Sequence, residues 1–169
     1  MSPRYTDAVN EAARLRRIRI ILAGFMIGLA LSGITAFPLK WELGILVDHF
    51  GSGDGGLATW LRLVKRGLVE TDAKYPFLAY GTDWLAFGHV MIAIAFVGAW
   101  RNPVKNIWLF EFGLIACALV VPWAFVFGAV RGIPLWWRLI DCSFGVFGFI
   151  PLWYCRRYAR ELAGHPAGN

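Results

Sequence analysis

The sequence predicts an all-α integral membrane protein: a four-transmembrane-helix bundle with amphipathic interfacial helices in its first extracytoplasmic loop. Three observations predict this class. Hydrophobic residues make up 58% of the chain and charged residues only 17%, which is unlike the composition of soluble domains. Four apolar runs have about the length that a helix needs to cross the hydrocarbon of a bilayer. None of these runs alternates with period two, as the strands of a membrane barrel do.

The apolar runs set the expected spans. They cover residues 20–39, 84–100, 112–130 and 139–155, in which His89 and Asp141 are the only Asp, Glu, His, Lys or Arg residues. We expect a single membrane domain of residues 1–169, with spans at about 18–38, 83–100, 107–129 and 137–156, an outer loop at 39–82 and short tails. The first run follows a long polar lead and precedes no clear cleavage site, so it is interpreted as a retained anchor rather than a signal peptide.

Basic residues predict the orientation. They flank the spans on one side at Arg14, Arg16, Arg17, Arg19, Arg101, Lys105, Arg156, Arg157 and Arg160. Because cytoplasmic loops carry an excess of Lys and Arg, both termini are expected in the cytoplasm, in a bacterial cytoplasmic membrane. The net charge of +6 is therefore interpreted as a topology signal, with no nucleic-acid partner. Glu111 is expected at the same end, as an interfacial ion pair with Arg101 or Lys105.

Two stretches of the outer loop have amphipathic patterns. Residues 57–70 place Leu57, Trp60 and Leu61 on one side of a helix and arginines and lysines on another, as in helices that lie in the membrane interface. Residues 40–50 form a second candidate. At the N-terminus, residues 2–17 predict a short amphipathic helix on the cytoplasmic face, with a disordered terminus as the alternative.

Small residues predict where helices pack closely. Gly24, Gly28 and Ser32 recur every four residues in the first span, and Gly145 and Gly148 share one face of the fourth. Such spacing lets another helix approach, and for the first span a partner within the chain is favoured over a dimer. The three cysteines Cys117, Cys142 and Cys155 lie at different depths, so no disulfide is expected. They also lack the CxxC spacing of zinc and redox sites.

One polar cluster is the candidate site. Asp141 shares a face of the fourth span with Arg138 and must point into the bundle. His89 in the second span lies at a similar depth near the outer leaflet. Trp84 and Trp137 supply aromatic walls. A purely structural role is one hypothesis, with an ion pair between Arg138 and Asp141 at i,i+3 and a hydrogen bond from His89.

Functional alternatives use the same residues. A quinone would find proton carriers in His89 and Asp141, whereas haem b is less favoured, since His49 is the only possible second ligand. Two ligands are too few for catalytic zinc, so no metal site is predicted. No hydrolase or phosphate-binding motif appears, and no inverted repeat indicates a transporter. No catalytic residues are therefore assigned.

The predicted function is a non-catalytic accessory or structural subunit. Its expected partners are the lipid bilayer and other membrane subunits or further copies of the chain, which it would bind through glycine-rich and aromatic helix faces. The alternative is a small membrane redox protein that binds a quinone, or less favourably haem b, at His89, Asp141 and Arg138.

Overall fold

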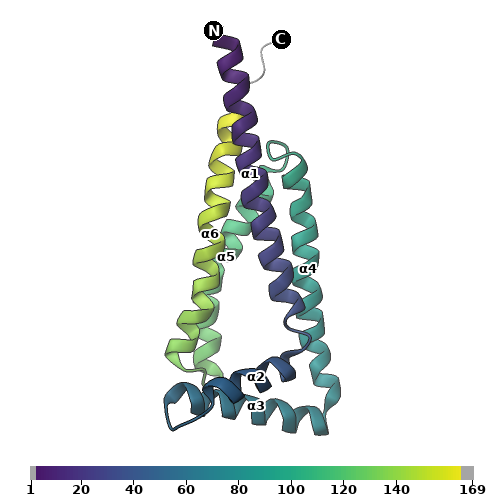
Figure 1. The fold of residues 1–169 in the computed structure, drawn as a ribbon, viewed down its shortest axis with the longest axis vertical. Helices are drawn as coiled ribbons and strands as arrows, with labels where there is room; N and C mark the ends of the chain where they lie inside the picture. Colours follow the sequence, from purple (N-terminus) through teal and green to yellow (C-terminus); the bar gives the residue numbers. More distant parts are fainter. Residues whose placement is uncertain (1–2, 165–169) are drawn as a thin grey trace. The chain divides into compact units, whose positions relative to one another are not determined.

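All regular structure in the described part of the chain is helical. The computed structural model describes residues 3–164, with side chains from Val9 onward. Its elements follow in this order: α1 (Pro3–Ile34), α2 (Leu39–Phe50), α3 (Gly56–Lys74), the 3-10 helix η1 (Pro76–Ala79), α4 (Tyr80–Arg101), α5 (Ile107–Val130) and α6 (Leu135–Ala163) (Figure 1). Four stretches are long and apolar enough to cross a membrane: Val9–Ile34, Pro76–Arg101, Ile107–Val130 and Leu135–Ala163. The prediction of four such helices is confirmed.

The first helix differs from its prediction. A separate amphipathic helix at 2–17 was expected before a span at 18–38, but α1 runs unbroken from Pro3 to Ile34, and residue 2 lies outside the described residues. No glycine or proline stands between Arg4 and Ala23 to end the helix. The helix also ends earlier than the predicted span: residues 35–38 form a non-helical turn. The prediction of two separate elements was therefore wrong.

The first of two compact units includes the described residues 3–27 and 94–164. Within it, α5 and α6 are antiparallel neighbours (Figure 1). Apolar side chains from four helices form its buried core: Ile18, Leu22, Phe96, Ala99, Leu109, Phe110, Leu152, Cys155, Ala159 and Leu162. The rings of Phe25 and Phe96 meet edge to face at 5.0 Å beside this core. The core lies toward the end of the unit where α6 terminates.

The turn between α5 and α6 is closed by backbone hydrogen bonds. The N–H of Ile133 donates to the carbonyl of Gly128 at 2.8 Å, and the N–H of Gly132 donates to that of Ala129 at 3.1 Å. This pair of bonds defines the Schellman motif, which satisfies the last carbonyls of a helix. Gly132 has φ of +68°, a conformation that costs a residue with a side chain more than it costs glycine. The turn therefore fixes how α5 and α6 align.

The second unit spans residues 28–93. Its helices α2 and α3 are in contact, and Leu43, Ala58 and Leu61 are buried. Arg62 donates to the carbonyls of Gly51 and Gly53, the latter at 2.8 Å, and so fastens the glycine-rich loop to α3. Lys40 forms an ion pair with Asp72 across the two helices. Helices α2 and α3 cover the two stretches, residues 40–50 and 57–70, whose patterns are amphipathic. Their position in a membrane interface stays a prediction.

Candidate functional site

His89 lies on α4 in the second unit and is half-buried. Its Nδ1 is 2.8 Å from the carbonyl oxygen of Leu85. Since a carbonyl can only accept, Nδ1 carries the proton, and Nε2 is left with the lone pair that could accept a hydrogen bond or bind a ligand. The end of α1 passes close by: a Cβ built on Gly33 would stand 2.7 Å from the Cβ of His89. Gly33 was not among the predicted packing positions.

Arg138 and Asp141 lie on α6 in the first unit and do not pair with each other. The Nε of Arg138 donates to the carbonyl of Ile133 at 2.7 Å. Its alkyl stem covers Gly128, where an added Cβ would come within 2.8 Å of it. Among the side chains that the structure describes, Asp141 has neither an ion-pair nor a hydrogen-bond partner. The expected i,i+3 ion pair is therefore wrong, because the turn carbonyl at Ile133 offers Arg138 a nearer acceptor.

The three-residue cluster remains a prediction, since His89 belongs to the second unit and Arg138 and Asp141 to the first. Trp84 is 56% exposed, and its ring meets Phe87 edge to face at 5.6 Å. The ring centroid of Trp137 lies 5.5 Å from that of its neighbour Trp136. Within residues 3–164, no three His, Cys, Asp or Glu side chains converge in a way that could hold a metal ion.

Two of the predicted packing glycines lie where α5 meets α6. A Cβ on Gly145 would stand 2.6 Å from the carbonyl oxygen of Cys117, and one on Gly148 would stand 2.8 Å from its sulfur. Real Cβ atoms do not approach so closely, so α5 and α6 could not reach this separation with larger residues there. All three cysteines are free thiols.

Gly24 and Gly28 have different surroundings. A Cβ built on either one meets no atom within 4 Å, and Ser32 is exposed. Large apolar side chains flank these glycines on the exposed side of α1: Ile20 is 62% exposed, Ile27 60% and Leu31 55%. Neither glycine is packed against another helix of its own unit, in contrast to Gly145 of α6.

Sequence reasoning missed two further close contacts. Gly113 of α5 leaves room for Leu152, whose Cδ1 would lie 2.6 Å from an added Cβ, and Gly128 leaves room for Arg138. In each pair, one residue precedes the turn at residues 131–134 on α5 and the other follows it on α6. The two lie about the same number of residues from that turn. The short turn is the signal that could have identified them, because it sets the register of two antiparallel helices.

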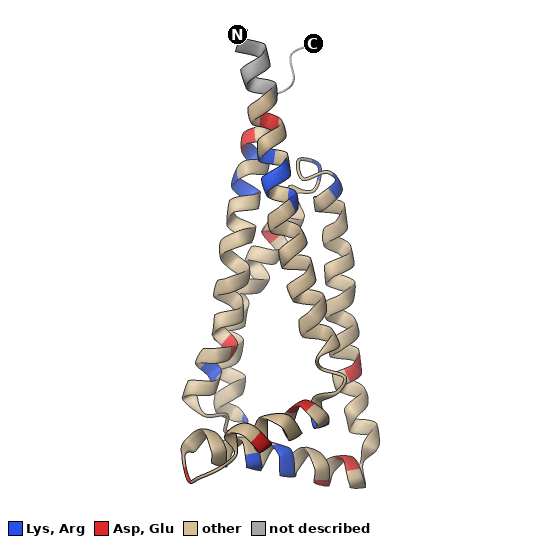
Figure 2. Ribbon diagram, in the orientation of Figure 1, with Lys and Arg blue, Asp and Glu red and all other residues tan. Residues whose placement is uncertain are grey.

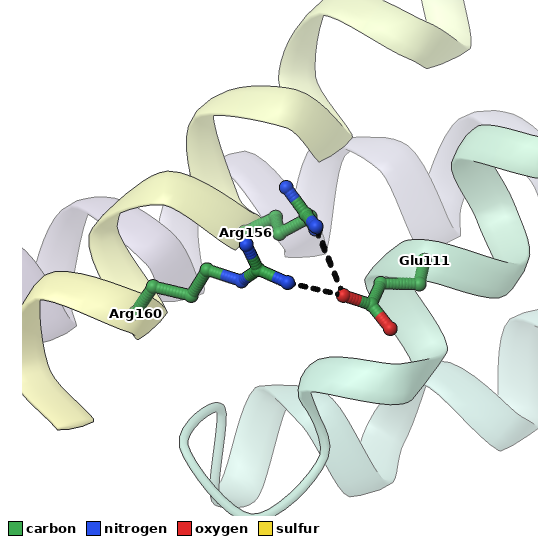
Figure 3. A network of polar contacts seen from close by, with 3 residues as sticks. All are labelled: Glu111, Arg156 and Arg160. Carbon is green, nitrogen blue, oxygen red and sulfur yellow. Dashed lines mark hydrogen bonds and ion pairs between the residues drawn. The ribbon is translucent and has the colours of Figure 1, made fainter.

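A polar network that joins α5 to α6 lies elsewhere, at Glu111. Its Oε1 accepts hydrogen bonds from Nε and Nη2 of Arg156 at 3.1 and 3.0 Å, and from Nη2 of Arg160 at 2.8 Å (Figure 3). Both arginines project from α6 toward the first turns of α5. The sequence predicted Arg101 or Lys105 as the partner, which was wrong. Those residues are close in sequence, whereas antiparallel packing brings Arg156 and Arg160 to the same level as Glu111.

Cations collect at one end of the first unit. Figure 2 shows Lys and Arg side by side near the start of α1, the end of α6 and the loop between α4 and α5. Arg14 lies 3.7 Å and Arg157 3.1 Å from carboxylate oxygens of Glu161. Arg19 stacks over Trp100, with its guanidinium carbon 5.8 Å from the ring centroid. This group of residues is called the basic end. It holds more cations than carboxylates: Arg14, Arg16, Arg17, Arg19, Arg101, Lys105, Arg156, Arg157 and Arg160, with Glu11, Glu111 and Glu161.

The chain matches no protein-family model, and comparisons with curated proteins and with solved structures likewise gave no match.

Proposed function

We propose that the chain is a multi-pass integral membrane protein with a non-catalytic role, a subunit that binds a second membrane protein or another copy of itself. Insertion is supported by the four long apolar helices and by their exposed side chains. Phe147 is 74% exposed, Val130 73% and Trp123 68%. In water such surfaces would be unfavourable, but lipid tails cover them without cost.

The orientation follows from charge. The basic end combines the early part of α1, the end of α6 and the loop between α4 and α5 (Figure 2). The excess of Lys and Arg in cytoplasmic segments puts this end, and with it both termini, in the cytoplasm. Helices α2 and α3 then belong to the outer side. Their amphipathic character, with Leu43 and Leu61 buried and Arg66 exposed, supports a position in the outer interface.

The open face of α1 is the observation that carries the binding role. Gly24 and Gly28 lie one helical turn apart, flanked by exposed Ile27 and Leu31. Small residues at this spacing let two helix backbones approach, and van der Waals contact then holds them together in lipid. The other helical glycines with neighbours in contact, such as Gly145, are already occupied by the chain's own helices. Other helical glycines with open space, such as Gly67 and Gly88, have no second open glycine four residues away. We therefore place the closest approach of a second polypeptide at Gly24 and Gly28.

The test replaces these glycines. In mild detergent, the wild-type chain extracted from its own membrane is expected to run on native gels as a complex larger than the monomer. Gly24→Leu with Gly28→Leu should reduce it to the monomer, because the leucines hold the partner helix away. Gly88→Leu is the matched control, since Gly88 also has open space but lies on α4. A monomeric wild type, or equal loss in the control, contradicts the proposal.

A quinone-binding redox role is the second candidate. It is favoured by Asp141, an acid on a long apolar helix that has no partner among the described side chains, and by the Nε2 of His89, which carries a lone pair when Nδ1 is protonated. Protein purified gently should then carry stoichiometric quinone, and Asp141→Asn should lose it while the fold is retained. Haem b instead would give a Soret band that His89→Ala removes. A colourless and quinone-free protein contradicts this candidate.

A further inference from the structure

An open groove lies on the first unit at the basic end. It has a volume of about 420 Å³ and lies between α1 and the end of α4. Apolar residues make up most of its wall, and two arginines stand at its rim: it is lined by Ala12, Leu15, Arg16, Arg19, Ile20, Ala23 and Trp100. The groove therefore runs from the charged lead of α1 into its apolar span. A ligand that fits it has a charged end and an apolar end.

The charged end of the ligand must be an anion. Arg19 is held at the rim by its contact over the Trp100 ring and by a hydrogen bond from its Nε to the Trp100 carbonyl at 3.4 Å. Neither Arg16 nor Arg19 has a carboxylate within ion-pair distance among the described side chains. Both guanidinium groups are therefore available to an anion.

The neighbouring arginines differ in this respect. Glu111 neutralises part of the charge of Arg156 and Arg160, and Glu161 does the same for Arg14 and Arg157. The carboxylates of Glu111 and Glu161 thus pair with arginines outside the groove. Arg16 and Arg19 at the rim of the groove therefore keep a positive charge that no ion pair among the described side chains balances. They lie on α1 just before its apolar run begins.

We infer that this groove binds one anionic phospholipid, whose headgroup phosphate lies between Arg16 and Arg19 and whose acyl chain runs along Ile20 and Ala23. Guanidinium groups bind phosphate oxygens in a bidentate geometry that suits this role. Basic pockets beside membrane helices on the cytoplasmic side are where anionic headgroups bind. The inference rests on the insertion and orientation proposed above. It shares Ile20 with the exposed side of α1 but uses neither Gly24 nor Gly28.

Native mass spectrometry of the detergent-purified chain tests it, with phosphatidylglycerol and phosphatidylcholine as probes. The wild type should retain one phosphatidylglycerol in preference to phosphatidylcholine. Arg16→Gln with Arg19→Gln should weaken this binding about five-fold for each arginine removed. The matched control is Arg17→Gln with Lys105→Gln, which removes the same charge from the same end but leaves the groove intact, and it should retain most of the affinity.

Three outcomes overturn the inference. Equal losses in the two double variants indicate diffuse attraction without a site. Equal binding of both lipids means that the groove does not select a lipid with a net negative charge, which contradicts the inference. Displacement of the lipid by inorganic phosphate indicates a simple anion site, since a phosphate ion gains nothing from Ile20 and Ala23. Extraction of native membranes with alkaline carbonate separates these results from failure of the membrane proposal, because a chain that is not inserted is released.

A second measurement locates the lipid. Phosphatidylglycerol brominated on its acyl chains quenches nearby tryptophans, and Trp100 lines the groove. Trp100→Phe should reduce the quenching caused by one bound lipid, whereas Trp123→Phe, a change on the exposed surface of α5, should not. Quenching that is unchanged by Trp100→Phe means that the lipid binds elsewhere, which overturns the assignment.

Discussion

Arg156 donates two hydrogen bonds, from Nε and Nη2, to a single carboxylate oxygen of Glu111, and thereby joins α6 to the first turns of α5. Arg160 donates to the same oxygen from one turn further along α6. Because these residues are distant in sequence, the contact holds α5 and α6 together at the end opposite their connecting turn.

Replacing Glu111 by Gln should lower the stability of the first unit, because two arginines then face each other without an anion between them. We expect a fall of a few degrees in the midpoint of thermal unfolding, measured by circular dichroism in detergent. Glu70→Gln, on an exposed position of α3, is the control. The effects of Glu111→Gln and Arg156→Gln should not add in a double-mutant cycle. Additive effects would mean that the pair does not interact in solution.

Gly145→Ala should destabilise the contact between α5 and α6. The new methyl group would stand 2.6 Å from the carbonyl oxygen of Cys117, so the helices must separate, at a cost of about 1–3 kcal/mol. Gly28→Ala enters open space and should change the stability little. Titration with a denaturing detergent, followed by circular dichroism, measures both. Equal stabilities of the two variants would contradict the close approach.

Gly132→Ala tests the turn. Gly132 has φ of +68°, and an alanine there costs about 1 kcal/mol because its Cβ crowds the backbone. Gly88→Ala, on a helical position with open space, is the comparison and should be neutral or slightly stabilising. The same denaturing titration reports the difference. A neutral Gly132→Ala would show that the turn adopts another conformation.

Arg138→Met separates the two contacts of Arg138. Methionine keeps an alkyl chain over Gly128 but cannot donate to the carbonyl of Ile133, so we expect a loss of about 1 kcal/mol. Arg138→Ala should cost more, since it also removes the packing. Asp141→Asn should leave stability almost unchanged, because no ion pair joins it to Arg138. A large effect of Asp141→Asn would restore the pair that the sequence predicted.

The orientation can be tested by labelling. In a background with Cys117, Cys142 and Cys155 replaced by Ala, Asp54→Cys should react with a membrane-impermeant maleimide in intact cells, because the loop between α2 and α3 is proposed to lie outside. Lys105→Cys should react only after the cells are opened. The reverse pattern would contradict the cytoplasmic assignment of the basic end.

The four long helices were predictable because apolar length alone specifies them. The continuity of α1 was missed for a physical reason: an amphipathic pattern such as that of residues 9–17 is common to interfacial helices and to helices that pack against a neighbour. In the structure Leu15 packs against the core that contains Ile18. The apolar side of this segment is therefore used for contacts within the chain. The absence of glycine and proline was the better guide.

The partner of Glu111 shows where sequence reasoning failed. Proximity in the chain favoured Arg101 and Lys105, but a turn as short as residues 131–134 sets the register between α5 and α6 and brings Arg156 to Glu111. Counting outward from that turn would have identified the pair, as it would have identified Gly113 with Leu152. The position of His89 relative to Asp141 had no such guide, because a loop of about forty residues separates the first two spans and no short turn joins α4 to α6.

The unbroken length of α1 has a mechanical consequence. Its 32 residues extend about 48 Å at the rise of an α-helix, which exceeds the roughly 30 Å of hydrocarbon in a bilayer. The additional turns of α1 continue into the apolar part of the helix without a break. If the chain is inserted as proposed above, a protein bound to the protruding turns would transmit rotation or tension directly to the span, without first having to order a linker.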